Sequence, residues 1–326
     1  MSGKFERTVL VTGGTSGLGY QCALKIAREH PTYLVVVSAR SDKDGAVESL
    51  NSTLKQSNVV FMPLDLSNLA NVRSFAAQWE LKQFPAIHSL VLNAALQFPD
   101  GIQYSDDGFE KTFAISHVGH ALLLFLLRKY LADTARIAVV SSGTHDPAQK
   151  SGLPDAHYVS AEQLAHPTPE IIQKSGRQHY SNSKLANILF TYRLDRQFQD
   201  INKRLGKHWT INAFDPGLMP GTGLAREAGP VLAFVWHNIF PKIRWLLNLF
   251  MNNNVHTPEE SGSSLARLVI GSDLEKTSGQ YFEGRKPIKS STESYDEKKQ
   301  EDLWQWTINT LAKDEAEKRS FHMTEE

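Results

Sequence analysis

The sequence has almost no cysteine and no excess of either charge. Its single cysteine, Cys22, cannot form an internal disulfide, and no cluster of cysteine and histidine has the spacing of a structural zinc site. Lysine plus arginine and aspartate plus glutamate both number 35, so no overall field favours nucleic acid or an acidic membrane. We therefore expect a reduced, intracellular protein without a metal, whose partner is a small molecule and not a nucleic acid.

Long uninterrupted apolar runs are also missing. The N-terminal sequence MSGKFERTVLVTGG has no signal-peptide pattern, so secretion is not expected. The most apolar later stretch, 231–251, is broken by His237, Pro241, Lys242 and Arg244, which argues against a transmembrane segment. Three interpretations of this stretch remain open: a substrate lid, packing in a core or subunit interface, and peripheral contact with a membrane. We expect a cytoplasmic protein, for which a homo-oligomer is possible.

Short apolar runs rich in β-branched residues alternate with segments of helical character. Such runs are typical of parallel strands that helices cover on both faces. The sequence predicts one α/β domain over 1–285, a Rossmann-type doubly wound parallel sheet, with a C-terminal helix and frayed tail over 286–326 packed on it. Two insertions, 145–178 and 224–258, leave the carboxyl edge of the sheet and are interpreted as substrate loops. The predicted strands are Thr8–Thr12, Tyr33–Ser38, Val59–Leu64, Ser89–Leu92, Arg136–Ser141 and Trp209–Phe214.

A glycine-rich loop, TGGTSGLG over 12–19, follows the first predicted strand and opens a helix that begins near Tyr20. Gly13 can make the tight turn, Gly17 lets the backbone approach a pyrophosphate, and Gly19 permits close packing of the helix on the strand. The helix N-terminus offers unpaired N–H groups to phosphates. Because of its place between a first strand and a helix, the loop predicts dinucleotide binding.

The ends of the next two strands indicate which nucleotide binds. The second strand ends in Val37-Ser38-Ala39-Arg40, without the acidic residue that often binds the ribose 2′-hydroxyl of NAD. Arg40 can pair with a 2′-phosphate, which favours NADPH/NADP+; a solvated surface arginine is the alternative. Asp65, after the third strand, either accepts a hydrogen bond from an adenine amino group or caps a helix.

Tyr180 and Lys184 are four residues apart and would share one face of a helix. An ammonium group beside a phenol favours the phenolate, so we expect Lys184 to lower the pKa of Tyr180 from about 10 and make it a usable acid/base. Ser142, after the strand Arg136–Ser141, either donates a hydrogen bond to a developing alkoxide or caps a turn. Hydride transfer to a carbonyl needs a nicotinamide, a polarising donor and a proton source, and these motifs supply all three.

Together these motifs resemble the short-chain dehydrogenase/reductase family from Thr8 to about Gly284. Asn93-Ala94-Ala95 is similar to its Asn-Ala-Gly turn, and Asp215-Pro216-Gly217 to its Pro-Gly turn beside the nicotinamide. The segments 180–187 and 222–224 are similar to the retinol dehydrogenase and protochlorophyllide reductase-like branch, many of whose members reduce bulky apolar ketones or aldehydes.

The resemblance implies the role of each site residue. Tyr180 would donate the proton, Lys184 would hold the nicotinamide ribose, and Ser142 would orient the carbonyl. Thr222 would contact the cofactor near its carboxamide. The complete set of expected cofactor contacts is Gly13, Thr15, Ser16, Gly17, Leu18, Gly19, Arg40, Asp65, Leu66, Asn93, Ala94, Ala95, Tyr180, Lys184, Pro216, Gly217, Leu218 and Thr222.

The chain departs from the family at Ser116, where an asparagine usually holds a water that links the lysine to solvent. Ser116 is counted with the catalytic residues, but its relay would use an extra water or run slowly. His117 and His120 beside it are expected to be structural. Two functions follow: an NADPH-dependent oxidoreductase that interconverts a ketone or aldehyde and an alcohol on a bulky apolar or aromatic molecule, or a cofactor-binding scaffold or sensor with weak catalysis.

Overall fold

The computed structural model describes residues 5–99, 101–172, 175–220, 238 and 254–323. Eight strands form one sheet in the order β3-β2-β1-β4-β5-β6-β7-β8, and all neighbours pair in parallel except the antiparallel β7 and β8. The predicted α/β doubly wound fold is confirmed. The strands are β1 (Arg7–Thr12), β2 (Tyr33–Ala39), β3 (Val59–Pro63), β4 (Ile87–Leu92), β5 (Leu131–Val140), β6 (Thr210–Asp215), β7 (Tyr281–Glu283) and β8 (Lys286–Ile288).

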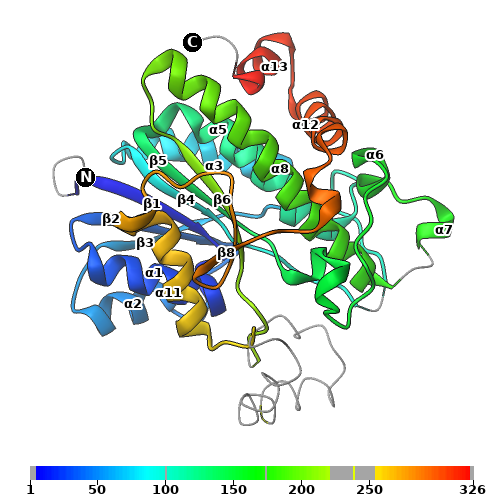
Figure 1. The fold of residues 1–326 in the computed structure, drawn as a ribbon. Coiled ribbons are helices and arrows are strands. Elements are labelled where there is room, and N and C mark those ends of the chain that lie inside the picture. The colour runs from blue at the N-terminus through cyan, green and yellow to red at the C-terminus, as the bar shows by residue number, and fades with distance from the viewer. Residues whose placement is uncertain (1–4, 100, 173–174, 221–237, 239–253, 324–326) are drawn as a thin grey trace.

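Helices cover both faces of the sheet (Figure 1). On one face lie α1 (Gly17–Glu29), α2 (Ala46–Leu54) and α11 (Pro258–Ile270), and on the other α3 (Leu69–Lys82), α5 (Gly119–Leu127) and α8 (Gly176–Leu205). The C-terminal helices α12 (Glu297–Leu311) and α13 (Glu315–His322) follow on the outer side of α8 (Figure 1). This arrangement leaves the carboxyl ends of the strands as the edge at which loops can form a site.

The strands are apolar because each contributes to two cores. Val9 and Val11 of β1 pack in the core under α1 and α11, whereas Leu10 between them packs in the core under α3, α5 and α8. All three side chains are fully buried. Side chains of a strand alternate between faces, so a sheet covered twice needs apolar residues at consecutive positions.

The predicted and observed strands differ at the end of the sheet. All six predicted strands are present, but β7 and β8 were not predicted, because three residues each are too few to show a pattern. The region expected as one helix and a frayed tail begins with β8 and contains two helices, α12 and α13. Asp314 begins the second of these helices by accepting a hydrogen bond from the backbone N of Glu317.

The insertion 145–178 and several short helices complete the fold. The insertion 145–178 is fixed to α12, since the Tyr158 hydroxyl donates to Asp302 Oδ2 at 2.6 Å. Of the second insertion, 224–258, the described part is residue 238 and residues 254–258. The short elements are α4 (Lys111–Phe113), the π-helix η1 (Ala114–Val118), the 3-10 helices η2 (Arg128–Tyr130), η3 (Gly143–His145), η4 (Pro147–Gln149), η7 (Ser272–Leu274) and η8 (Thr292–Tyr295), and α6 (Ala161–Ala165) and α7 (Pro169–Ile172).

Candidate active site

A cavity of about 940 Å³ lies at the carboxyl ends of β1, β2, β4, β5 and β6. It is lined by the glycine loop at one end and by the tyrosine and lysine of α8 at the other, so motifs far apart in the sequence meet in one space. A crevice at this edge is where open α/β sheets bind ligands. The expected site residues that line it are Gly13, Thr15, Ser16, Gly17, Leu18, Arg40, Asp65, Leu66, Asn93, Ala94, Ala95, Ser142, Tyr180, Lys184, Pro216, Gly217 and Leu218.

The glycine loop has the backbone shape that a bound pyrophosphate needs. Gly13 and Gly17 have φ angles of +65° and +53°, which glycine adopts without steric cost. A Cβ at Gly19 would lie 2.3 Å from the Gly13 carbonyl oxygen, so only glycine allows α1 to approach this closely. Ser16, at the N-cap of α1, makes no side-chain capping hydrogen bond, and its first turn contains no acidic residue. The N-terminus of α1 is thus suited to an anion.

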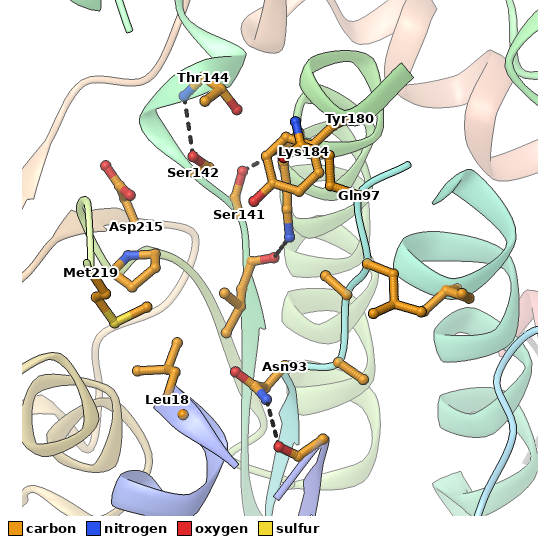
Figure 2. A pocket seen from close by; sticks show the side chains of 18 of the residues that line it. Leu18, Asn93, Gln97, Ser141, Ser142, Thr144, Tyr180, Lys184, Asp215 and Met219 are labelled. Carbon is orange, nitrogen blue, oxygen red and sulfur yellow. Dashed lines mark hydrogen bonds between the residues drawn. The ribbon is translucent and has the colours of Figure 1, made fainter. Parts of the chain in front are cut away.

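Thr12 and His120 fix the loop that follows β4. The backbone N–H groups of Asn93 and Ala94 donate to Thr12 Oγ1 at 2.9 and 3.0 Å, and Asn93 Nδ2 donates to the Thr12 carbonyl oxygen at 2.7 Å (Figure 2). His120 Nδ1 lies 3.1 Å from the Ser116 carbonyl oxygen and must donate to it, because a carbonyl only accepts. His120 Nε2, 2.8 Å from Thr12 Oγ1, can then accept from that hydroxyl.

Arg40 and Asp65, the two residues expected at the adenosine end of the cofactor, have different surroundings. Arg40 is exposed and lines the cavity, and no acidic side chain of the described chain forms an ion pair with it. Asp65 Oδ1 accepts hydrogen bonds from Ser67 N at 2.9 Å and Ser67 Oγ at 2.7 Å. The alternative that Asp65 caps a helix is wrong, because Asn68 caps α3.

Tyr180 and Lys184 project from α8 toward the end of β5 (Figure 2). Both are buried, and Lys184 Nζ lies 5.3 Å from the centroid of the Tyr180 ring. Lys184 Nζ donates to the Val140 carbonyl oxygen at 3.1 Å, and Asn187 Nδ2 donates to the same oxygen at 3.0 Å. The Ser141 hydroxyl donates to the carbonyl oxygen of Lys184 at 2.7 Å. The pair therefore occupies one face of α8, held against the strand end.

The electrostatics of this pair correct one expectation. Burial raises the pKa of Tyr180, the Asp215 carboxylate raises it further, and a hydrogen bond with Ser142 opposes both. Burial lowers the pKa of Lys184 to about 8, while Asp215 acts in the opposite direction. The prediction that the pKa of Tyr180 is lowered is wrong for this structure, because the cost of charging a buried phenol exceeds the stabilisation of its phenolate.

Ser142 is half-buried beside Tyr180, and its backbone is held by a histidine that the sequence reasoning missed. His145 Nδ1 donates to the Ser142 carbonyl oxygen at 2.7 Å, and His145 Nε2 accepts from Ser291 N at 3.0 Å. The imidazole is fully buried, and burial lowers its pKa, so it stays neutral. Ser142 Oγ also accepts from Thr144 N at 3.3 Å, so the serine both forms a turn and faces the cavity (Figure 2).

Three of the expected site residues are not among those that line the cavity: Gly19, which packs against the Gly13 carbonyl, Ser116 and Thr222. Ser116 lies in the π-helix η1, where its neighbour Ile115 lines the cavity; the buried Ser116 hydroxyl has no hydrogen-bond partner among the described residues. Thr222 lies outside the described residues, as does 231–251 apart from residue 238. The structural role expected for the two neighbouring histidines is confirmed: His117 Nε2 lies 2.9 Å from Thr307 Oγ1, and His120 bridges the Ser116 carbonyl oxygen and the Thr12 hydroxyl.

Several polar lining residues were not found from the sequence. Gln97, Gln149 and Arg177 line the cavity at the end near Tyr180. Arg177 lies on the same helix three residues before Tyr180, a spacing that places both on adjacent turns and could have been noticed. The burial of Asp215 at the end of β6 has no such local signal. Within the described ranges there is no cluster of histidine, cysteine, aspartate or glutamate that could hold a metal ion.

Comparison with known proteins agrees with this site. A family model described as short chain dehydrogenase matches residues 7–153, and a model described as AcuH dehydrogenase domain matches 227–318. The chain is 30% identical over 305 residues to polyprenol dehydrogenase of Danio rerio, covering 91% of this chain and 84% of that protein. It is 31% identical over 311 residues to retinol dehydrogenase 14 of Mus musculus, with coverage of 91% and 84%. The protein belongs to the short-chain dehydrogenase family, in the branch that resembles retinol dehydrogenases.

Solved structures show the same fold. The NADPH-bound carbonyl reductase from chicken fatty liver superposes with a TM-score of 0.60 at 17% sequence identity, covering 88% of this chain and 94% of that chain. Among the helices that the structure describes, none has the length and apolar character needed to cross a membrane. The class of protein is therefore an oxidoreductase with a Rossmann fold, which acts on small molecules with a nicotinamide cofactor.

Proposed function

We propose that the protein is an NADPH-dependent oxidoreductase that interconverts a ketone or aldehyde and an alcohol, with Tyr180 as the proton donor. One observation carries this proposal. Tyr180, Lys184 and Ser142 meet at the end of a cavity whose other end is the glycine loop. A proton donor and a hydride donor bound in one cavity are what carbonyl reduction requires.

The residues of the cavity fit a dinucleotide. Gly13, Gly17 and the uncapped first turn of α1 would hold the pyrophosphate, and Arg40 would pair with a 2′-phosphate. Lys184 uses one of its N–H groups on Val140, which leaves others for the nicotinamide ribose. The bound cofactor supplies a hydride at this place. The unpaired Arg40 and the absence of an acid at the end of β2 support NADPH over NADH.

The described side chains supply the proton and orient the oxygen. In the reductive direction the O–H bond of Tyr180 breaks and an O–H bond forms on the substrate oxygen, as the carbonyl carbon receives the hydride. The raised pKa of Tyr180 keeps it a neutral phenol, which is the form that donates. Ser142 stands beside Tyr180 and would orient the same oxygen through its hydroxyl (Figure 2).

The substrate that we propose is a bulky apolar or aromatic molecule, and the compartment is the cytoplasm. Leu96, Pro99, Ile115 and Leu153 give the cavity an apolar wall, and its volume of about 940 Å³ is at the upper end of the range for small-molecule and cofactor sites. The names of the relatives support this choice, because polyprenol and retinol are apolar alcohols.

The test is turnover by the purified protein with NADPH and a panel of aromatic and cyclic ketones and apolar aldehydes. We expect Tyr180→Phe to reduce kcat/KM by about 10² to 10⁴, the contribution of a positioned general acid. Tyr104→Phe, at an exposed tyrosine outside the cavity lining, is the matched control and should retain the wild-type rate. Equal background rates in wild type and Tyr180→Phe would favour the cofactor-binding scaffold to which the unusual Ser116 points.

The nucleotide assignment has its own test. Arg40→Asp should weaken NADPH binding about ten- to a hundredfold, the loss of a hydrogen-bonded charge pair, and should favour NADH instead. Binding is measured by NADPH fluorescence. Arg28→Asp, an exposed site outside the cavity lining, is the control. If Arg40→Asp binds NADPH as tightly as the wild type, Arg40 is a solvated surface residue and the preference for NADPH has no support.

A further inference from the structure

Asp215 is a buried carboxylate in the wall of the catalytic end of the cavity. It ends β6, lines the cavity and is 1% exposed. Its Oδ1 accepts a hydrogen bond from Gly217 N at 2.9 Å, and its Oδ2 accepts from Asn254 Nδ2 at 2.9 Å. Both donors are neutral, and no side chain of the described ranges forms an ion pair with Asp215. A charge buried without a cation is costly, so its presence needs a reason.

The groups that face Asp215 come from each element packed around it. The helix α8 contributes Tyr180 and Lys184, the strand β7 contributes Tyr281 and Glu283, and η3 contributes His145; Asp215 raises the pKa of every one of them. His145 is held neutral by its two hydrogen bonds. Among these groups Lys184 is the one that can be a cation at neutral pH.

Asp215 and Lys184 stand on opposite sides of the end of β5 in Figure 2, with Ser141 and Ser142 between them. They do not form a direct ion pair, since Lys184 Nζ donates to Val140. The buried charges of Asp215 and Lys184 are opposite and not in contact, so their electric field acts on the groups between them and beside them. The group beside them whose protonation the reaction depends on is the phenol of Tyr180.

Building on the proposed function, we propose that Asp215 is a positioning residue whose negative charge favours the ammonium ion of Lys184 and adds to burial in holding Tyr180 as a neutral phenol. The site would thereby be set to donate a proton, which is the step of carbonyl reduction. Each turnover moves the Tyr180 proton to the substrate oxygen and the NADPH hydride to the carbonyl carbon, and solvent returns a proton to Tyr180. No other co-reactant is needed.

The contacts of Asp215 allow its charge to be tested apart from its shape. The hydrogen bond from Gly217 N needs only an acceptor at Oδ1, which asparagine also provides. Asn254 Oδ1 is buried and makes no hydrogen bond to the described residues, so a rotated Asn254 amide can accept from the new side-chain N–H₂ of Asp215→Asn. Asp215→Asn therefore removes the charge and keeps the turn.

The first experiment measures Lys184 in the cofactor-free protein, where no turnover is involved. Isocyanic acid, formed from cyanate, reacts with the neutral amine. The carbamylation rate of Lys184 divided by the isocyanic acid concentration, followed by peptide mass spectrometry from pH 6 to 10, therefore reports its ionisation. Since the pKa of Lys184 is lowered to about 8, the wild-type midpoint should lie near that pH. Asp215→Asn should move the midpoint to lower pH by about one unit, the size that one neighbouring charge produces.

The matched control is Glu283→Gln, which removes a carboxylate from the same cavity lining. Glu283 is not among the groups that shift the pKa of Tyr180 or Lys184, so the Lys184 midpoint should stay at its wild-type value. An unchanged midpoint in Asp215→Asn, or an equal shift in both variants, would overturn the proposal. A Lys184 shift in a protein that reduces no carbonyl would support the role of Asp215 while refuting the proposed function.

The second experiment is the pH profile of kcat/KM for carbonyl reduction. The alkaline limb, where Lys184 loses its proton, should move to lower pH in Asp215→Asn by about one unit. A uniform loss of rate at every pH would indicate a structural role and contradict the proposal. If Asp215→Asn does not fold, Asp215→Ser keeps an acceptor for Gly217 N and is measured in the same way. Failure of both variants to fold would also assign Asp215 to structure.

Discussion

Two buried histidines should make the fold sensitive to mild acid. His117 and His120, in η1 and at the start of α5, are 1% and 3% exposed. Burial lowers the pKa of His117 to about 3 and that of His120 to about 4. His120 must be neutral to accept from Thr12, whose hydroxyl also binds the backbone of Asn93 and Ala94 beside the cavity. Protonation of this pair would therefore disturb both the core and the cofactor end of the site.

The size of the effect follows from proton linkage. In the unfolded chain each histidine has a pKa of about 6.5, so below that pH the unfolded state binds protons that the folded state excludes. The lowered folded-state pKa values give stability that is fully present above about pH 6.5 and is lost as the pH falls below it. Between pH 7 and pH 5 each histidine should cost about 2 kcal/mol, and the two about 4 kcal/mol, of a total that is typically about 5–15 kcal/mol.

The assay is urea unfolding at pH 7 and pH 5 at constant ionic strength. His117→Gln is expected to be less stable than the wild type at pH 7, because the core is disturbed. Its further loss between pH 7 and pH 5 should nevertheless be smaller than the wild-type loss by about 2 kcal/mol. His208→Gln, at an exposed histidine, should lose as much as the wild type. Equal losses in the wild type and His117→Gln would refute the reasoning, since carboxylates that titrate in this range affect both proteins alike.

Two further substitutions test the cofactor loop and the C-terminal region. Gly19→Ala places a Cβ 2.3 Å from Gly13 O and 2.7 Å from Asn93 Nδ2, so the loop must shift. NADPH fluorescence titration should show binding about tenfold weaker in a protein that still folds. Unchanged binding would contradict the close packing. Trp304→Ala removes a side chain that is 1% exposed and packs on Phe125 and Phe190. This substitution should lower the free energy of unfolding, measured by urea unfolding, by about 3–5 kcal/mol. A loss below about 1 kcal/mol would show that α12 is not part of the main core.

The features predicted well from the sequence are those written in neighbouring residues. The central strands were found because burial on both faces requires consecutive apolar residues, as at Val9, Leu10 and Val11. The glycine loop lies between one strand and one helix, and Tyr180 and Lys184 lie on adjacent turns of a single helix. In each case local backbone geometry alone brings the functional atoms together.

The features that were missed depend on contacts between distant residues. His145 matters because Ser291, 146 positions later, donates to it, and no local pattern shows this pairing. The direction of the Tyr180 pKa shift was wrong because spacing reveals the nearby lysine but not the depth of burial or the Asp215 carboxylate. The strands β7 and β8 have three residues each, too few to show a pattern, and they form by pairing with β6 and with each other.

The end of β5 shows why the reactive groups can be held still without a ligand. Val140 O accepts from both Lys184 Nζ and Asn187 Nδ2, so its two lone pairs are used and the lysine has a fixed anchor. Ser141 and Ser142 are bound in turn to the Lys184 carbonyl and to His145. The ammonium group of Lys184 has three N–H donors, and one of them donates to the Val140 carbonyl oxygen. The remaining two therefore extend from a fixed point in the cavity wall, where the ribose hydroxyls of a dinucleotide can meet them without reordering the lysine.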